Sequence, residues 1–358
     1  MSTGRKSKSV NLPIVTKAAI LVAPNRVLEI AEITLPTQLD IGQVLVELVY
    51  SGICGSQLGE IDGVKGHDAW LPHLLGHEGS GKVIAIGPGV KYFVPGDHVV
   101  LHWKPSQGIE ATPAKYQWGN QKVNAGWVTT FNHFAVISEN RLTKIDPTAD
   151  LKIAALFGCA VTTGFGVIDN QAKLKLGETI VIFGSGGIGL NMVQAAHLAG
   201  ASQIIAIDLF DHRLELSKLC GATTVINATC QDPWLQLESI FKKQALDIFI
   251  DNTGKPDIIA KGYELVSSRG RVVLVGVPSK NQKTLLHTLP LHFGKTIIGS
   301  QGGEIIPQTD IARYMSLLQA RSIDLNPLIS DINDLDHVNQ MISNMRDGTS
   351  AGRCLIRF

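Results

Sequence analysis

The chain has 358 residues, of which 44% are hydrophobic and 18% are charged, and 32 Lys and Arg residues face 31 Asp and Glu residues for a net charge of +1. This composition supports a folded core and excludes a disordered, collagen-like or coiled-coil protein. The nearly equal numbers of positive and negative residues argue against a nucleic-acid-binding or membrane-surface protein, because such proteins concentrate charge of one sign.

The cysteines bear on the cellular compartment. They are odd in number, widely spaced and free of any C-x-x-C pair: Cys54, Cys159, Cys220, Cys230 and Cys354. A disulfide framework is therefore not expected, and the pattern favours the cytoplasm over a secreted setting.

The amino-terminal part of the chain is rich in strand-like runs. Residues 1–10 are basic and polar and lead into no apolar signal core, so we expect a loose tail. Gly and Pro then separate short β-branched runs at 44–52, 79–87, 96–101 and 128–138, with no helical pattern between them. This predicts an antiparallel, barrel-like domain.

From residue 179 to 300, apolar runs alternate with helical patterns. The predicted strands are 179–183, 203–207, 223–227, 246–250, 271–276 and 295–299. The predicted helices are the segment after the glycine turn at 184–189, then 211–222, 233–244 and 256–266. This alternation predicts a doubly wound, mostly parallel sheet.

The uncharged stretch 179–207 within this region is long enough to cross a bilayer. Its glycines and polar residues divide it into strand, turn, helix and strand, so no membrane span is expected. A helix at 309–320 and a final strand at 354–358 follow, and we expect that strand to return to the first domain. The predicted domains are residues 1–160 with 302–358, and residues 161–301.

A glycine-rich turn connects the first predicted parallel strand to its helix. Gly184, Gly186 and Gly189 form a G-x-G-x-x-G that includes Gly187, a pattern that brings backbone and a helix amino end to a pyrophosphate. Asp208 ends the next strand, 19 residues after Gly189, where a carboxylate binds ribose hydroxyls and repels a 2′-phosphate. The pattern predicts NAD rather than NADP, although Arg213 could accommodate NADP. A glycine turn that binds nothing is the alternative.

Two cysteines and a histidine are candidate metal ligands. Cys54 follows a predicted strand, His77 lies between strand-like runs and Cys159 lies at the approach to the nucleotide fold. Because the three are far apart in sequence, each could equally be a packed core residue, and their spacing alone does not decide between these roles.

The order of several motifs along the chain favours the metal site over packed core residues. Cys54-Gly-Ser56, Gly76-His77-Glu78-Gly79-x-Gly81, Gly96-Asp97-x-Val99, Cys159-x-x-x-Thr163-Gly164 and the glycine turn follow one another along the chain. From residue 17 to 358 the sequence resembles the zinc-dependent alcohol dehydrogenases of the medium-chain dehydrogenase/reductase family. The resemblance implies an α/β protein with a GroES-like antiparallel β-barrel catalytic domain and a Rossmann domain.

The resemblance also implies roles for individual residues. Cys54, His77 and Cys159 would bind one catalytic zinc, and Glu78 matches a carboxylate that can approach the metal. Such a zinc acts as a Lewis acid on an alcohol whose hydride passes to the nicotinamide. Ser56 matches a hydroxyl bonded to the substrate oxygen, and Trp103 matches a residue of the substrate pocket. The matched cofactor contacts are Thr163, Ile188, Arg213, Val275, Val277 and Arg353.

The sequence departs from the family at two places. Residues 102–127 contain no cysteine where many relatives carry four that bind a structural zinc, so we expect one metal per chain. Tyr116, Trp118 and Trp127 are candidates to replace that metal as an aromatic cluster or a partner contact.

Three residues near Cys54 also differ from the family. Gly55 replaces an arginine at the pyrophosphate, and Gly59 replaces a histidine of the proton relay. Gln57 replaces an aspartate that orients the zinc-bound histidine, and we expect its amide to accept the histidine N–H and make His77 a weaker ligand. His67, His102 and Lys104 are candidate polar residues of the substrate cleft.

The sequence thus predicts an NAD-linked, zinc-dependent alcohol dehydrogenase or carbonyl reductase for a polar secondary alcohol, such as a sugar or polyol derivative. A zinc-independent reductase of an activated double bond and a non-catalytic NAD-binding protein are the alternatives. We expect a homodimer or homotetramer formed through the sheet edge near 296–300, with no nucleic-acid or membrane partner.

Overall fold

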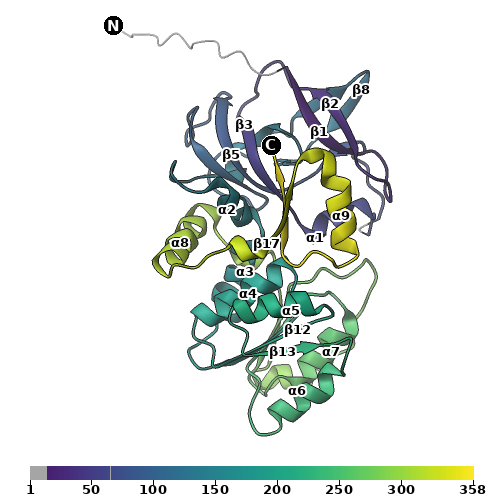
Figure 1. The fold of residues 1–358 in the computed structure, drawn as a ribbon, viewed down its shortest axis with the longest axis vertical. Coiled ribbons are helices and arrows are strands. Elements are labelled where there is room, and N and C mark those ends of the chain that lie inside the picture. The colour runs from purple at the N-terminus through teal and green to yellow at the C-terminus, as the bar shows by residue number, and fades with distance from the viewer. Residues whose placement is uncertain (1–13, 65) are drawn as a thin grey trace.

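The computed structural model describes residues 14–64 and 66–358, so the predicted amino-terminal tail lies outside the described residues. Figure 1 shows two lobes, with the barrel strands β1, β2 and β8 in one and strands β12 and β13 in the other. Helix α3 and strand β17 lie between the two lobes in this view.

A small closed barrel forms one part of the first lobe. Its strands are β1 (Val15–Leu21), β2 (Glu29–Thr34), β7 (Lys115–Trp118), β8 (Gln121–Asn124) and β4 (His73–Leu74). The side chains inside it include Ala18, Ile20 and Ile33, which are almost completely buried. The predicted barrel-like domain is therefore present, but all five strands of the closed barrel were missed by the sequence pattern, because the predicted runs form β3, β5, β6 and β9 of the neighbouring sheet.

A seven-stranded sheet packs beside this barrel. In spatial order its strands are β10 (Leu142–Lys144), β6 (His98–His102), β5 (Glu78–Ile86), β3 (Gln43–Ile53), β18 (Arg353–Arg357) and β17 (Ile329–Asn333), with β9 (Phe134–Ser138) also on β3. Strand β3 is long enough to pair with β9 through its first half and with β18 through its second half. The carboxyl-terminal strand therefore returns to the first lobe, as predicted.

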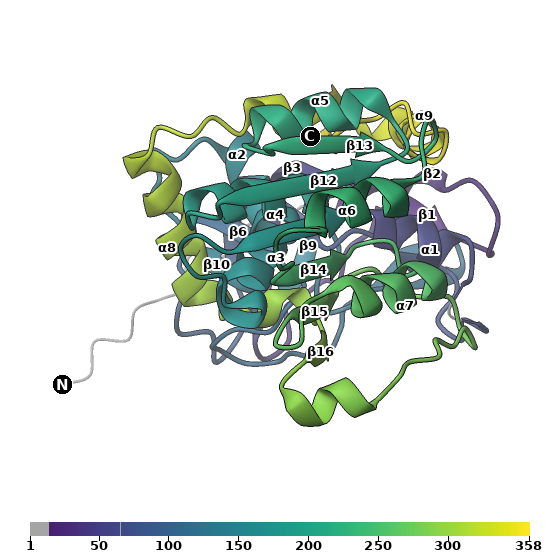
Figure 2. The same cartoon turned by 90° about the horizontal axis from the view of Figure 1, so that it is seen from below.

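The second lobe contains a six-stranded parallel sheet, which Figure 2 shows from below. Its order is β13 (Thr224–Asn227), β12 (Gln203–Asp208), β11 (Thr179–Phe183), β14 (Ile248–Asp251), β15 (Arg271–Leu274) and β16 (Thr296–Gly299). All six predicted strands are present, and the order reverses direction at β11, as in a doubly wound nucleotide-binding fold.

Helices cover both sheets and connect the lobes. The α-helices are α1 (Gly55–Ile61), α2 (Leu151–Ala155), α3 (Ala160–Gly166), α4 (Gly187–Leu198), α5 (Asp211–Leu219), α6 (Pro233–Phe241), α7 (Pro256–Leu265), α8 (Pro307–Ala320) and α9 (Val338–Arg346). A π-helical turn, η3 (Val167–Ala172), continues α3. The short 3₁₀ turns are η1 (Glu139–Arg141), η2 (Leu156–Gly158), η4 (Leu289–Phe293), η5 (Gly302–Glu304), η6 (Asn326–Leu328) and η7 (Leu335–His337).

The parallel sheet is buried on both faces, because successive side chains of a strand point to opposite sides. Ile180 and Ile182 of β11 pack into a core with α3, α4 and α8, whereas Val181 and Phe183 pack into a second core with α6 and α7. The first core continues into the other lobe through residues such as Phe157. This shared core fixes the junction of the two lobes.

Local boundaries differ from the sequence prediction in a few places. The predicted strand 128–138 is regular only from Phe134, because the backbone of Thr130 and Phe131 donates to Leu75 O instead of pairing with β3. The predicted helix 233–244 ends at Phe241, and helices α1 and α9 and strand β17 were not predicted.

The stretch 179–207 forms β11, α4 and β12, which is the division into strand, turn, helix and strand that the sequence predicts. Within the described residues, no single helix has the length and apolar character needed to cross a bilayer. One pair of helical segments, 151–158 and 160–172, meets the length and composition test together but is bent by 54°.

Candidate active site

Three elements bring the predicted metal ligands together. Cys54 directly follows β3 and caps α1, His77 lies in the turn between β4 and β5, and Cys159 precedes α3. The turn at Gly76 has a φ of +87°, and a Cβ there would lie 2.3 Å from Thr130 Oγ1. Glycine at this position therefore lets the chain turn tightly enough to direct His77 inward.

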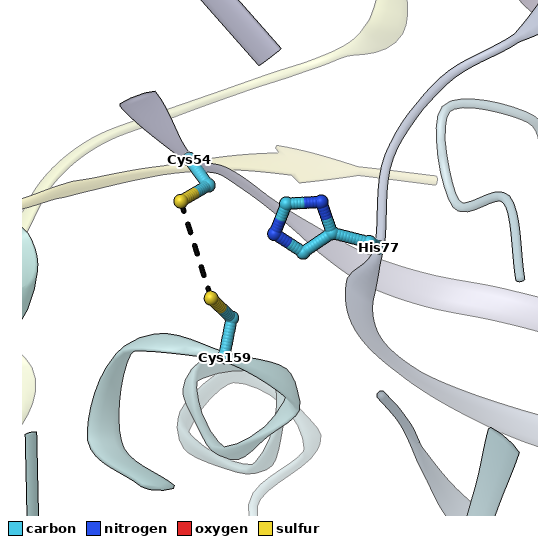
Figure 3. A group of neighbouring side chains, drawn as sticks. All are labelled: Cys54, His77 and Cys159. Carbon is cyan, nitrogen blue, oxygen red and sulfur yellow. Dashed lines mark hydrogen bonds between the residues drawn. The ribbon is translucent and has the colours of Figure 1, made fainter. Parts of the chain in front are cut away.

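Figure 3 shows the side chains of Cys54, His77 and Cys159 converging on one point. Their ligand atoms all lie within 4.8 Å of one another, and the two sulfurs are 3.9 Å apart. Within the described residues, this is the one group of three or more potential ligands that could hold a metal. The residues predicted from motif order are thus adjacent in space.

The pKa values of the two thiols, Cys54 and Cys159, are shifted in opposite directions. Their mutual hydrogen bond holds the pKa of Cys54 well below its usual value, against the opposing effect of burial. The same hydrogen bond, together with burial, raises the pKa of Cys159 well above its usual value. The shared hydrogen bond therefore shifts the pKa values of the two thiols in opposite directions.

Glu78 and Arg353 form a buried ion pair beside the metal ligands. Arg353 Nε lies 3.0 Å from Glu78 Oε1, and both side chains are at least 95% buried. Burial raises the pKa of Glu78, and the guanidinium of Arg353 opposes that rise. Arg353 also donates to Ile53 O at 3.1 Å, next to Cys54.

Arg353 connects this pair to the glycine turn. A Cβ added at Gly187 would lie 3.3 Å from Arg353 Cζ, so the guanidinium lies against the first residue of α4. The buried Nη2 of Arg353 and the Oγ of Ser185 have no hydrogen-bond partner within the described residues. Unsatisfied buried donors beside a helix amino end are suited to an anionic group.

Each glycine of this turn is needed for a different structural reason. Gly184 has a φ of +101°, and a Cβ at Gly189 would lie 2.1 Å from Gly184 O. A Cβ at Gly186 would meet no atom within 4 Å, which leaves its face of the turn open. The turn is therefore tight on the protein side and open where a phosphate would approach.

Asp208 lies at the end of β12, at the same edge of the sheet. Its carboxylate accepts from Ser185 N at 2.7 Å and from Leu209 N at 2.8 Å. Arg213 Nη1 lies 3.7 Å from Asp208 Oδ1, while its Nε donates to Ser350 O. The guanidinium of Arg213 is thus held between Asp208 and the carboxyl-terminal segment.

Comparison with known proteins agrees with this geometry. Residues 40–147 match the alcohol dehydrogenase GroES-like domain, and residues 187–320 match the domain of zinc-binding dehydrogenases. The chain is 29% identical to the S-(hydroxymethyl)glutathione dehydrogenase of Haemophilus influenzae over 370 aligned positions, which cover 96% of this chain and 97% of that protein.

Two solved structures are also similar over nearly the whole chain. Benzyl alcohol dehydrogenase from Acinetobacter calcoaceticus has 28% identity and a TM-score of 0.85, with 96% of this chain and 99% of that chain covered. An alcohol dehydrogenase zinc-binding domain protein from Burkholderia ambifaria has 27% identity and a TM-score of 0.87, with the same coverage.

The chain belongs to the zinc-dependent alcohol dehydrogenases of the medium-chain dehydrogenase/reductase family. A tetrahedral zinc with Zn–S bonds of about 2.3 Å would place two sulfur ligands about 3.8 Å apart. The separation of Cys54 and Cys159 is 3.9 Å, so the donor set of this dehydrogenase fits zinc without rearrangement of the sulfurs.

The other predicted site residues of the dehydrogenase lie around the junction of its lobes. Ser56 is exposed in the first turn of α1, and Thr163 is buried in α3. Ile188 is half-buried in the first turn of α4, and Val275 and the exposed Val277 follow β15. Trp103 contacts the segment between the lobes, because a Cβ at Gly302 would lie 2.5 Å from its ring.

Two predictions about polar residues of the cleft need correction or refinement. His102 has no exposed surface, and its ring nitrogens lie 2.7 Å from Lys104 O and 2.9 Å from Thr143 Oγ1. It is therefore a packed core residue and not part of an open cleft. Lys104 bonds across the junction to Gln301 O at 2.7 Å, whereas His67 is exposed.

The aromatic residues of the cysteine-free lobe do not gather as expected. Tyr116 packs in the barrel core beside the partly buried Trp118, and its hydroxyl accepts from Val136 N at 2.8 Å. Trp127 instead lies half-exposed under Arg141, whose Cζ is 5.2 Å from the ring centroid. A single cluster of all three rings is therefore not formed, because Trp127 lies apart from Tyr116 and Trp118, and the alternative of a partner contact stays a prediction.

Glu139 organises this lobe and was missed by sequence reasoning. Its carboxylate is almost fully buried and accepts from the backbone of Lys91 and Ile109, at 2.7 and 2.8 Å, and from Tyr92 at 3.1 Å. Buried carboxylates need such donors. A lone glutamate after a predicted strand carried no signal of this role.

The expectation for Gln57 is also contradicted. The oxygen of its side-chain amide accepts from Cys54 N at 2.8 Å, and it is the amide nitrogen that contacts His77 Nδ1. The amide therefore does not accept the histidine N–H, because its acceptor is already used.

Proposed function

We propose that this dehydrogenase transfers hydride between an alcohol and NAD with one zinc ion per chain. The observation that carries the proposal is the convergence of Cys54, His77 and Cys159 within 4.8 Å, beside an arginine that lies against the glycine turn. Arg353 is a neighbour of both the metal ligands and the phosphate-binding turn. An alcohol bound at the metal and the nicotinamide of a cofactor bound at the turn would therefore lie close together.

In this proposal each residue has a stated task. Cys54, His77 and Cys159 hold the metal, and zinc, when bound, supplies the Lewis acid that acidifies an alcohol. Ser56, exposed two residues after Cys54, hydrogen-bonds to the substrate oxygen and, as it takes up the proton of the alcohol, releases its own hydroxyl proton to solvent. Glu78 and Arg353 balance charge beneath the metal ligands.

The cofactor is held by the turn and by the edge of the parallel sheet. Gly184, Gly186, Gly187 and Gly189 form the phosphate cradle, with Arg353 as a donor to the pyrophosphate. Asp208 binds the adenosine ribose and disfavours a 2′-phosphate, so we propose NAD over NADP. The remaining contacts are assigned to Thr163, Ile188, Arg213, Val275 and Val277.

The substrate proposed is a polar secondary alcohol, such as a sugar or polyol derivative. Trp103 supplies an apolar wall, and the ammonium of Lys104 lies at the junction of the lobes, where a hydroxyl-rich substrate would find donors and acceptors. The named substrates of the relatives include a hydroxymethylated thiol and an aromatic alcohol, so a panel of alcohols is needed to test this class.

We further propose that the protein is a cytoplasmic homodimer or homotetramer. Its five cysteines are all free, which is typical of a reducing compartment. The domains proposed remain 1–160 with 302–358, and 161–301.

Metal analysis and the variant Cys159→Ser test the function. Cys159→Ser should lower turnover by more than about 100-fold, since even changes behind the ligands cost 10–100-fold, and should leave NAD affinity nearly unchanged. Cys230→Ser, which alters an exposed cysteine, is the matched control and should keep full activity.

Three outcomes would contradict the proposal. Full activity in zinc-free protein would remove the metal from the reaction. Reduction of activated double bonds without zinc would favour a zinc-independent reductase. NAD binding without hydride transfer from any alcohol or aldehyde tested would favour a non-catalytic protein.

A further inference from the structure

Gln57 connects two of the three proposed metal ligands through its side-chain amide. It lies in the first turn of α1 with only 1% of its surface exposed. One end of the amide lies 2.8 Å from the backbone nitrogen of Cys54, and the other end contacts Nδ1 of His77. Both ends are therefore engaged, and water has little access to either.

The chemistry of these two contacts fixes the orientation of the amide. The backbone N–H of Cys54 can only donate, so the end that faces it must be the carbonyl oxygen Oε1. The end that faces His77 is then the NH₂ group, which can only donate. Nδ1 of His77 must accept this hydrogen bond and therefore carries no proton.

A neutral imidazole keeps one proton, so the proton of His77 lies on Nε2. Figure 3 shows that this is the ring nitrogen directed toward the sulfurs of Cys54 and Cys159. In the metal-free chain, the nitrogen needed as a ligand is thus occupied by a proton.

Zinc binding requires the opposite arrangement, with the lone pair on Nε2 and the proton on Nδ1. For Nδ1–H to find an acceptor, the amide of Gln57 has to turn over. That rotation leaves the N–H of Cys54 facing an NH₂ group in a buried place, where an unsatisfied donor is costly. The same amide cannot serve both neighbours in the metal-bound state.

We propose that Gln57 is a positioning residue that holds His77 in the tautomer protonated on Nε2, so that zinc binds only with rearrangement of this amide and is held more weakly than a carboxylate at position 57 would allow. This inference rests on the zinc site of the proposed function. Because Gln57 weakens zinc binding, the fraction of this dehydrogenase that carries metal would depend on the available zinc concentration.

Gln57→Glu is the sharpest test, because glutamate has the same length and shape but two acceptor ends. One oxygen can keep the bond from Cys54 N–H while the other accepts from His77 Nδ1–H, which frees Nε2 for the metal. We expect the zinc dissociation constant, measured by competition with a chromophoric chelator, to fall by about 10–100-fold. Equal affinity in the two proteins would overturn the proposal.

A matched control separates this effect from added negative charge. Gln308→Glu also converts a glutamine to a glutamate, and the Oε1 of Gln308 already acts only as an acceptor, from Gln107 N at 2.9 Å. It should bind zinc as the unaltered chain does. A similar gain in Gln308→Glu would show that net charge, and not the tautomer, sets the affinity.

A second measurement reads the tautomer in the wild-type chain itself, and a variant serves only to assign the signal. The ¹⁵N chemical shifts of the His77 ring in the metal-free wild-type chain report which nitrogen carries the proton, with the signal assigned through His77→Asn. Protonation on Nε2 is expected, and protonation on Nδ1 would overturn the inference. If the chain bound no zinc at all, the proposed function would fail, while this measurement would still decide the role of Gln57.

Discussion

Arg353 is the residue at which the metal ligands and the glycine turn meet. It pairs with Glu78, donates to the carbonyl before Cys54 and lies against Gly187. Arg353 and Glu78 are separated by 275 positions in the chain, and each would be an expensive buried charge without the other. A single buried ion pair therefore lies between the metal ligands and the glycine turn.

His102 gives a prediction about pH at the residue scale. Burial lowers the pKa of His102 to about 4, and the positive charge of Arg141 lowers it further, while hydrogen bonds to the backbone of Lys104 and Leu142 only partly offset this. Since the folded-state pKa lies below the unfolded value of about 6.5, the native state favours neutral His102. The contribution to stability is complete above pH 6.5 and is lost as the pH falls toward 4.

Between pH 7 and pH 5, this one group should lower the free energy of unfolding by about 2 kcal/mol. Denaturant titrations of the wild type and His102→Gln at both pH values measure the effect. The variant should lose about 2 kcal/mol less than the wild type over this interval. Parallel losses in both proteins would mean that His102 is already charged in the folded state.

At the scale of elements, the turn η1 connects the cysteine-free lobe to the sheet. Glu139 receives backbone N–H groups from the loop at 91–92 and from Ile109, so one carboxylate joins two loops to the sheet. The neighbouring Arg141 donates to Trp103 O at 2.7 Å and pairs with Glu110. The cysteine-free lobe is thus held by hydrogen bonds whose donors are mostly backbone.

Glu139→Ala should lower the free energy of unfolding by about 3 kcal/mol, because three buried N–H groups lose a charged acceptor. Limited proteolysis should show faster cleavage within 103–118, and chelator treatment of the wild type should not reproduce that cleavage. Lys91→Ala is a suitable control, since the bond uses only the backbone of that residue. An unchanged stability would show that the lobe does not depend on this carboxylate.

At the scale of the whole molecule, the exposed edge of the parallel sheet is the proposed subunit contact. Strand β16 is the last strand of that sheet, and large apolar side chains near it are exposed: Leu285, Leu289, Phe293 and Ile298. An open edge with apolar neighbours favours pairing with a second copy.

Ile298→Asp combined with Phe293→Asp should convert the assembly to monomers, measured by size-exclusion chromatography with light scattering. Leu219→Asp introduces the same charge at a residue of α5 that is 76% exposed and should leave the assembly intact. A monomeric wild type, or a double variant of unchanged mass, would contradict the proposed interface.

The sequence alone determined the parts of this protein that depend on local pattern. Continuous apolar runs that alternate with helical patterns revealed the six parallel strands and their helices, and the spacing of Gly184, Gly186 and Gly189 revealed the turn between β11 and α4. The order of the motifs around Cys54, His77 and Cys159 revealed three ligands that the fold brings within 4.8 Å. These features are encoded by residues close together in sequence or by motifs of distinctive composition.

Tertiary structure alone decided which partner each buried polar group finds. His102 lies in the core because Thr143 and Lys104 O reach its ring, and Glu139 organises a lobe because two distant loops place their N–H groups around it. The orientation of the Gln57 amide follows from the fixed donor at Cys54 N. Such outcomes depend on long-range contacts, and an amide, an imidazole or a carboxylate can serve several roles until its neighbours are fixed in space.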